Sequence, residues 1–350
     1  MDYSICLATT GAGLWTSHDA GKSWLLSRCD RPKYPYELCT RAVASTAARP
    51  GVCGEVWASI DSEHGEDVVA RSTDGGETYA FAAVPAPGRQ IWALSVDPFE
   101  PGTILAGSRP AGVYRSTDGG ATWSALPTGV AETASIGHTR VTSIRHTQTP
   151  GEIWVSAEIG GLLHSTDGGD SWEKIHTEGG RALLGLDEVW TDERHFDMHD
   201  VAVGQTSDGR PALFAATPIG FFASEDGGTS WRSTRYPVDG AYEASLFYSR
   251  SLHVNPSEPA TVLCGVGRRP PDHGSLGGIH RSADGGLTWR PVSPVLRSVV
   301  WKMAAHPASP RHVVAVTLFG QVLLSADGGE SWQPADREFG EIRGVCVTGA

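Results

Sequence analysis

The stretch Ser116-Thr117-Asp118-Gly119-Gly120-Ala121-Thr122-Trp123 decides the fold, because the chain repeats its pattern seven times. Every copy has Ser, then Asp two residues later, Gly two after that, and Trp or Tyr three further on. The copies are 17–24, 72–79, 116–123, 165–172, 224–231, 282–289 and 325–332. Successive aspartates are 43 to 59 residues apart. A repeat of this length, with short strand-like runs between copies, is typical of radial β repetition.

Each octet is predicted to form a tight turn between two strands. Asp tolerates turn backbone and accepts hydrogen bonds from amides that follow it. Gly supplies the positive φ that such a turn needs. The closing aromatic residue, Trp123 in this copy and Tyr79 in the second, is expected to fill the space between packed sheets.

The pattern Ser-x-Asp-x-Gly-x-x-Trp resembles the Asp box of sialidases, of sortilin-type ten-bladed propellers and of plant photosystem assembly propellers. The resemblance covers the whole chain and implies that the box is a structural turn on the outer, lower side of a blade. His199-Asp200-Val201 and Glu158-x-Gly160-Gly161 also look like segments of small bacterial BNR-repeat propellers of the glycosyl-hydrolase-like kind.

Two departures limit what the resemblance implies about activity. Sialidases carry an arginine triad, a Tyr/Glu pair and an Asp on six blades, whereas this chain has seven repeats and does not reproduce that pattern motif by motif. Two-domain xyloglucanases have similar boxes but place catalytic aspartates between two propellers, and this chain has repeats for only one. The fold therefore implies no particular chemistry, since sites are grafted onto folds.

We expect an all-β protein in which residues 1–350 form a single seven-bladed propeller of four-stranded blades. In the third repeat the expected strands are 91–96, 103–106, 112–115 and 123–126, because these runs alternate and are separated by Gly and Pro. The chain begins on a second strand, at 4–9. The inner strand of that first blade is predicted at 342–347. The C-terminal strand would therefore join the N-terminal blade and close the ring.

Composition excludes some partners and indicates a compartment. The net charge of -12 argues against nucleic-acid binding, because proteins that contact phosphate backbones are usually basic. No apolar leader and no run of 18 apolar residues is present, so neither export nor a membrane span is expected. The six cysteines lack Cys-x-x-Cys spacing and are interpreted as small buried hydrophobes in a reducing, cytoplasmic compartment. The alternative for Cys29 and Cys39 is a disulfide within their shared loop.

Long connections mark the face on which function is expected. They precede inner strands at 25–40, 124–140, 173–197 and 232–247, with a further insert at 268–278, and the boxes lie on the opposite face. The segment 173–197 is the predicted lid. Aligning the inner strands on their apolar residues places one residue of each at the same height around a central channel. These are Arg41, Trp92, Thr142, His199, Arg250, Trp301 and Arg343.

The residues at this mouth predict a pocket for a small anionic or sugar-like molecule. Arg41, Arg250 and Arg343 form a clamp, because guanidinium groups bind carboxylate or phosphate through two parallel hydrogen bonds. An aromatic wall for a ring is expected from Trp92, Trp301 and Tyr248, with Arg109 added from the end of a second strand. The alternative is structural: the tryptophans pack between blades and the arginines pair with acids such as Glu341.

Candidate chemistry lies on two neighbouring blades. Glu158, His199 and Asp197 are the predicted catalytic residues of a hydrolase or lyase, acting as general acid and base without a cofactor. An alternative is a metal site formed by His195, Asp197, His199 and Glu158. A third interpretation is that these aspartates anchor the loop and His199 hydrogen-bonds across blades.

A second class of function stays open on the same residues. A non-catalytic scaffold or assembly factor would use the loop face to hold a protein partner. An arginine patch that extends outwards through Arg140, Arg268 and Arg269 would favour this scaffold, whereas a deep closed pocket would favour the small molecule.

Overall fold

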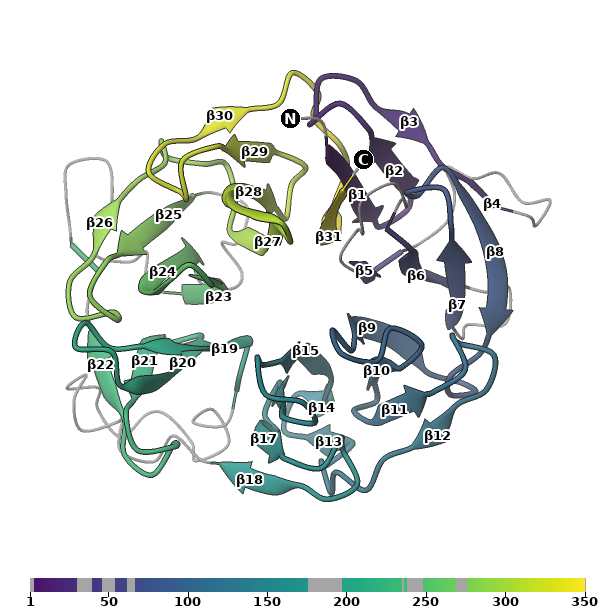
Figure 1. Ribbon diagram of the computed structural model, residues 1–350, viewed down its shortest axis with the longest axis horizontal. Coiled ribbons are helices and arrows are strands. Elements are labelled where there is room, and N and C mark those ends of the chain that lie inside the picture. Colours follow the sequence, from purple (N-terminus) through teal and green to yellow (C-terminus); the bar gives the residue numbers. More distant parts are fainter. Residues whose placement is uncertain are drawn as a thin grey trace.

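The computed structural model describes residues 3–29, 40–45, 54–61, 67–175, 197–234, 236–237, 248–268 and 276–349. These residues form seven blades arranged in a ring (Figure 1), which confirms the predicted all-β propeller. Six blades have four antiparallel strands and the remaining one has a fifth strand. Within the described ranges there is no helix, and so none that is long and apolar enough to cross a membrane.

The strands of each blade follow one another from the channel outwards. Blade one consists of β31 (Ile342–Gly349), β1 (Tyr3–Thr9), β2 (Gly13–Ser17) and β3 (Leu25–Leu26). Blade two has β5 (Val43–Ser45), β6 (Val56–Asp61), β7 (Asp67–Ser72), β8 (Thr78–Ala83) and the added β4 (Arg28–Cys29). Blade three has β9 (Gln90–Val96), β10 (Ile104–Arg109), β11 (Val113–Ser116) and β12 (Ser124–Ala125). Blade four has β15 (Val141–His146), β16 (Ile153–Ala157), β17 (Gly161–Ser165) and β18 (Glu173–Ile175), preceded by the hairpin β13 (Thr133–Ala134) and β14 (Gly137–His138).

The last three blades have the same arrangement. Blade five has β19 (Asp200–Gln205), β20 (Pro211–Thr217), β21 (Gly220–Ser224) and β22 (Arg232–Thr234). Blade six has β23 (Tyr248–Asn255), β24 (Glu258–Gly267), β25 (Gly277–Ser282) and β26 (Arg290–Pro291). Blade seven has β27 (Val300–His306), β28 (Ser309–Thr317), β29 (Val322–Ser325) and β30 (Gln333–Pro334).

The C-terminal strand closes the ring, as the sequence predicts. β31 lies beside β1 (Figure 1). The two strands pair antiparallel, with Tyr3 opposite Gly349 and Ile5 opposite Val347. β31 supplies the innermost strand of blade one and leaves β1 without a free edge. The two ends of the chain therefore stabilise one blade together.

One strand departs from the four-stranded prediction. Residues 28–29, expected within a long connection, form β4, which pairs parallel with β8 of blade two. The backbone N–H of Arg28 donates to the carbonyl of Glu77 at 2.8 Å. β8 would otherwise present its outer edge to solvent, and β4 covers part of that edge.

The Asp boxes are hydrogen-bonded turns at one end of the blades. In blade three Ser116 Oγ donates to Asp118 Oδ1 at 2.8 Å and accepts from the backbone N–H of Gly120 at 2.9 Å. Hydrogen bonds from the Thr122 side chain and backbone lower the pKa of Asp118 to about 2. In the ladder Ile104 lies opposite both Ser116 and Val96, so the box lies level with the carboxyl end of the inner strand. This places the boxes at the face opposite Trp92.

Replacing the buried box serine tests the turn. Ser116→Ala leaves the buried N–H of Gly120 without its acceptor, so a loss of about 1–2 kcal/mol in unfolding free energy is expected from urea titration. Ser124→Ala is the matched control, because Ser124 is exposed on the neighbouring strand. Equal losses from the two variants would contradict a structural role for the box serine.

Candidate anion-binding site in the central channel

Five inner strands carry a register shift at the same height, near their amino ends. In β9 the ladder passes from Ile91 to Ala93 and leaves Trp92 without an opposite residue. The same irregularity occurs at Thr142, Arg250, Trp301 and Arg343. A β-bulge re-aims a side chain, and bulges are common beside functional sites. These five are residues that sequence alignment placed at the channel mouth, and the other two, Arg41 and His199, lie just before β5 and β19.

Arginine and tryptophan side chains interleave at this mouth. The guanidinium carbon of Arg250 lies 3.8 Å from the ring centre of Trp301, and that of Arg343 lies 4.1 Å from the same ring. Arg140 lies 4.4 Å from the ring centre of Trp92. Such contacts orient a cation and are attractive. Trp301 is only 4% exposed, so its ring holds guanidinium groups and has little surface left for a sugar.

Four arginines lie at this mouth, Arg41, Arg140, Arg250 and Arg343, and three of them form ion pairs with carboxylates. Arg41 Nη1 lies 3.1 and 3.2 Å from the two oxygens of the buried Asp67. Arg140 pairs with Glu158 at 2.8 Å, and Arg343 pairs with Glu341. Burial raises the pKa of Asp67 to about 6, although the charge of Arg41 lowers it. Arg41 thus forms an ion pair with a neighbouring acid, as expected if the mouth arginines have a structural role.

Arg250 is the exception. It is 3% exposed, and within the described part of the chain its Nε and Nη1 have no hydrogen-bond acceptor. Burial lowers the pKa of this guanidinium. Leaving buried donors unpaired is unfavourable, and a bound anion would supply the acceptors they lack.

The predicted catalytic residues lie beside Arg250. His199 Nδ1 lies 2.7 Å from the carbonyl of Ser249, to which its N–H donates, and Nε2 is 3.6 Å from Asp197 Oδ1. The rings of His199 and Tyr248 are 4.6 Å apart. Burial first, and then the negative charge of Glu158, raise the pKa of Asp197 to about 7. A carboxyl group that titrates near neutral pH can act as general acid or base.

The pKa of Asp197 predicts how stability depends on pH. Its folded value exceeds the usual value of about 4, so the folded state binds more protons and stability falls as pH rises from about 4 to about 7. Asp197→Asn should remove a decline of about 1–3 kcal/mol across this window, measured by chemical denaturation at each pH. The buried Asp67 keeps a decline of the same sign in both proteins. Parallel curves of unfolding free energy against pH for the unaltered protein and Asp197→Asn would contradict the elevated pKa of Asp197.

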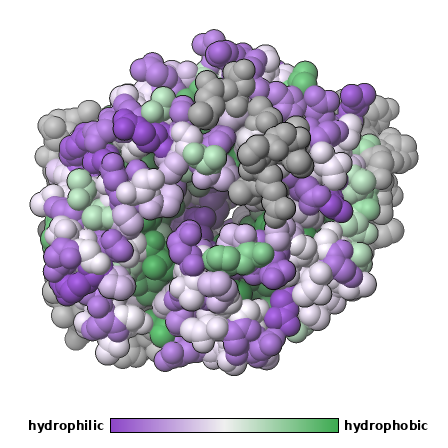
Figure 2. Space-filling model, in the orientation of Figure 1, coloured by the Kyte–Doolittle hydropathy of each residue, from purple (hydrophilic) through white to green (hydrophobic). Residues whose placement is uncertain are grey.

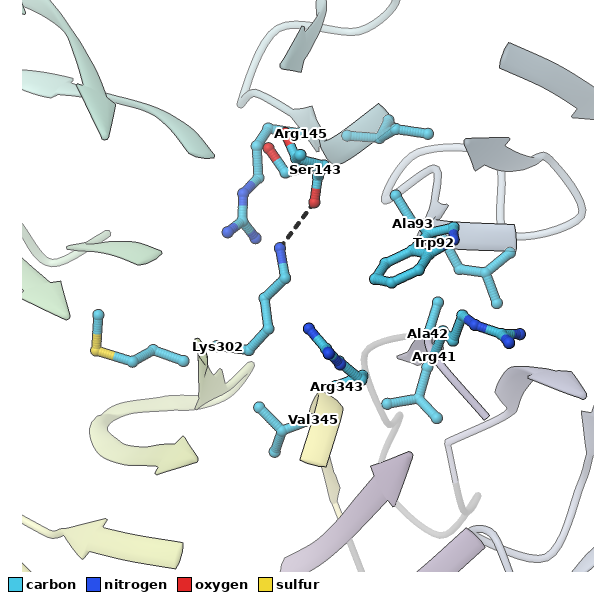
Figure 3. A pocket seen from close by; sticks show the side chains of 15 residues that line it. Arg41, Ala42, Trp92, Ala93, Ser143, Arg145, Lys302, Arg343 and Val345 are labelled. Carbon is cyan, nitrogen blue, oxygen red and sulfur yellow. Dashed lines mark hydrogen bonds between the residues drawn. The ribbon is translucent and has the colours of Figure 1, made fainter. Parts of the chain in front are cut away.

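A small cavity of about 70 Å³ lies in the channel next to the mouth (Figure 3). Lys302, Arg343 and Trp92 project towards it from β27, β31 and β9. Its described lining includes four cations and no carboxylate; the cations are Arg41, Arg145, Lys302 and Arg343. The absence of acidic lining makes the cavity electrostatically suited to an anion.

Two cations of this cavity, Arg145 and Lys302, were not predicted from the sequence, and Lys302 is the one without an ion-pair partner among the described residues. Its Nζ donates to the carbonyl of Thr142 at 2.9 Å, and no described carboxylate lies within ion-pair distance. Arg145, by contrast, binds Asp200 through Nη2 at 2.8 and 3.0 Å. Burial lowers the pKa of Lys302 to about 8, against the opposing charge of Asp200. One feature of the sequence could have indicated Lys302: it directly follows Trp301 in a chain with very few lysines.

A wider cavity of about 690 Å³ opens at the other end of the channel. It is lined by the carboxyl ends of β15, β19, β23 and β27, and Arg145 borders both cavities. Figure 2 shows the face viewed in Figure 1: hydrophilic residues cover much of it, and the surface is hollowed near the centre. The wider cavity could not be predicted from the sequence, because its lining comes from strand ends that carry no repeated pattern.

Several predicted residues lie apart from this cluster or outside the described residues. Arg109 ends β10 opposite Gln90, and no contact among the described residues joins its side chain to the arginine–tryptophan cluster. Most of the predicted lid, together with His195, Cys39 and Arg269, is outside the described residues. Among the residues that are described, no three metal-binding side chains lie close enough to hold an ion. The metal alternative and the Cys29–Cys39 pairing stay predictions.

Comparison with known proteins agrees with the fold. A model of the BNR/Asp-box repeat matches residues 114–125, and no curated protein matches the sequence.

The GH74 xyloglucanase from Xanthomonas campestris is 20% identical with a TM-score of 0.60, over 98% of this chain and 52% of its own. This chain thus spans about half the length of that enzyme. YCF48 bound to D1 peptide is 16% identical with a TM-score of 0.51, over 89% of this chain and 88% of its own. YCF48 from Cyanidioschyzon merolae is 17% identical with a TM-score of 0.52, over 87% of each chain. The chain is a seven-bladed β-propeller with Asp-box repeats.

Proposed function

We propose that this propeller binds a small anionic molecule, a carboxylate or a phosphate ester, in its central channel. The observation that carries the proposal is a cavity whose described lining holds four cations and no carboxylate. Three of these cations pair with carboxylates outside the lining, and Lys302 has no ion-pair partner among the described residues. Lys302 and Arg343 border the cavity, and Arg343 also stacks on Trp301, against which Arg250 lies. Cationic donors therefore follow the channel from the mouth inwards.

The size of the cavity restricts what enters it. Sites that enclose whole drug-sized ligands have volumes of roughly 300–1,000 Å³. A cavity of about 70 Å³ suits a carboxylate or phosphate group, with the rest of the ligand extending towards the mouth. An acidic sugar fits this arrangement through its charged group, because the ring faces of Trp301 lie against arginines.

A thermal-shift panel tests the proposal. Carboxylates, phosphate esters and neutral sugars are compared at constant ionic strength, and one anionic class is expected to raise Tm by mass action. Arg250→Ala should abolish most of that shift while changing the Tm of the free protein little, because two of its nitrogens have no described partner to lose. A panel without any shift would overturn anion binding and favour the protein-binding scaffold. A large fall in Tm for free Arg250→Ala would show that the residue is structural.

Acid–base chemistry on the bound ligand is a second candidate, favoured by the elevated pKa of Asp197 beside Glu158 and His199. A hydrolase or lyase would use one of these groups to donate a proton and another to accept one. The test incubates the ligand class identified by the panel with the protein and follows products by NMR. Asp197→Asn should lower turnover at least about 100-fold with binding retained. Absence of turnover in the unaltered protein would leave a binding protein.

A protein partner is the remaining alternative. The similar structure of YCF48 holds a D1 peptide, which makes a protein partner plausible for a propeller of this shape. Immobilised peptides of acidic, basic and neutral composition distinguish the cases when free carboxylate or phosphate is added as competitor. Retention that the free anion does not reverse would favour a protein partner, whereas a small-molecule site predicts at most retention of the acidic peptides that the free anion abolishes. The cytoplasmic location proposed from cysteine usage is tested separately by localising a tagged full-length chain.

A further inference from the structure

Two cysteines face each other where the ring closes. Cys6 on β1 lies directly opposite Cys346 on β31 in the antiparallel ladder. Both are buried and both are free thiols. β1 and β31 come from opposite ends of the chain, and their pairing alone completes blade one on its channel side.

The geometry of the ladder brings these thiols within bonding reach. Directly opposed residues in antiparallel strands have Cα atoms about 4.5 or 5.5 Å apart. Disulfides span Cα separations of about 4.4–6.8 Å. The side chains of opposed residues lie on the same face of the sheet, so no rotation of a strand is needed.

The two thiols differ in their surroundings. Thr16 Oγ1 lies 3.6 Å from the Cys6 sulfur, and the Cys6 thiol donates to the carbonyl of Gly75 at 3.4 Å. The neighbouring Cys346 thiol is the main cause that lowers the pKa of Cys6, whereas the pKa of Cys346 is raised. One sulfur of the pair is therefore the better nucleophile, and its neighbour is in position to complete an exchange.

We propose that Cys6 and Cys346 form a reversible disulfide that covalently closes the propeller ring. The oxidant is a small disulfide of the glutathione class. The Cys6 thiolate attacks one glutathione sulfur, which forms a mixed disulfide and releases one glutathione thiolate. The Cys346 thiol then loses its proton to that thiolate and attacks Cys6 Sγ, which releases the second glutathione. The two protein thiols are oxidised and the glutathione disulfide is reduced to two thiols.

The bond would restrain the unfolded chain strongly. Cys6 and Cys346 are 340 residues apart in the sequence, and the entropic effect of a crosslink grows with the length of the loop it closes. For a chain of this size we expect Tm to rise by about 5 °C on oxidation. Both sulfurs are buried, so access of glutathione requires local opening of β31 from β1.

The experiment uses the full chain, equilibrated in oxidised or reduced glutathione, alkylated, and analysed by intact mass and by peptide mapping. The expected result is a mass decrease equal to two hydrogen atoms, a crosslinked peptide containing Cys6 and Cys346, and the rise in Tm. Cys346→Ser should remove all three, whereas Cys29→Ser and Cys264→Ser should retain them. Three results would each overturn the proposal: stable glutathione adducts, a crosslink from Cys6 to any other cysteine, or two fully alkylated thiols after oxidation. Peptide mapping of the unaltered chain remains a valid test even if a variant does not fold.

Discussion

Deletion of residues 341–350 is expected to unfold the protein. This deletion removes β31, which supplies the inner strand of blade one and buries Ile342, Val345 and Val347 against β1 and blade seven. The loss exposes the edge of β1 and an apolar cluster at once, and more than about 5 kcal/mol of stability is expected to disappear. Circular dichroism and size-exclusion chromatography would show an expanded or aggregated chain.

Two controls separate ring closure from general sensitivity at the C-terminus. A flexible ten-residue extension after residue 350 should leave Tm unchanged, because it removes no strand. A synthetic peptide of residues 338–350, added to the truncated chain, should restore part of the cooperative transition. A truncated protein that melts cooperatively within a few degrees of the full chain would contradict closure by β31.

Lys302→Met is expected to weaken phosphate binding by about thirtyfold or more, because it removes a half-buried cation from the cavity. Isothermal titration at constant ionic strength measures the change. Lys22→Met is the matched control, since Lys22 is exposed in the first Asp box and should have no effect. Equal weakening by both variants would show that only net charge matters.

The free Lys302→Met protein should be about as stable as the unaltered one, or more stable. The folded pKa of Lys302, about 8, lies below that of the unfolded chain, so the folded state disfavours the charge and stability rises with pH between about 8 and 10. Lys302→Met should lack that rise. Phosphate affinity of the unaltered protein should fall as pH passes about 8, where the amine loses its proton, whereas the variant should show no such fall.

Local patterns were sufficient to predict the fold. The octet from Ser116 to Trp123 contains its own hydrogen-bond donors and acceptors, so its turn needs no distant residue, and the structure confirms it. The inner strand missing at the N-terminus predicted that 342–347 closes the ring. β4 was not predicted, because its pairing depends on the edge of a strand some fifty residues later.

The candidate site was predicted only in part. Alignment of the inner strands found the mouth residues, because the bulges recur at one height in five blades. The sequence did not show which arginines form ion pairs with carboxylates. Arg41 lies before β5 and its partner Asp67 begins β7, so their contact depends on how these strands pack. It also did not show that Lys302 lies in a cavity without a carboxylate in its described lining, because that depends on the orientation of five strands around the channel.

The most direct test of anion binding in the channel is anomalous diffraction from crystals soaked in selenate, a tetrahedral oxyanion with the shape of phosphate. We predict an anomalous peak in the cavity between Lys302 and Arg343, and its loss in crystals of Lys302→Met. An empty channel in the unaltered protein, or a peak that persists without the Lys302 amine, would contradict anion binding at this site.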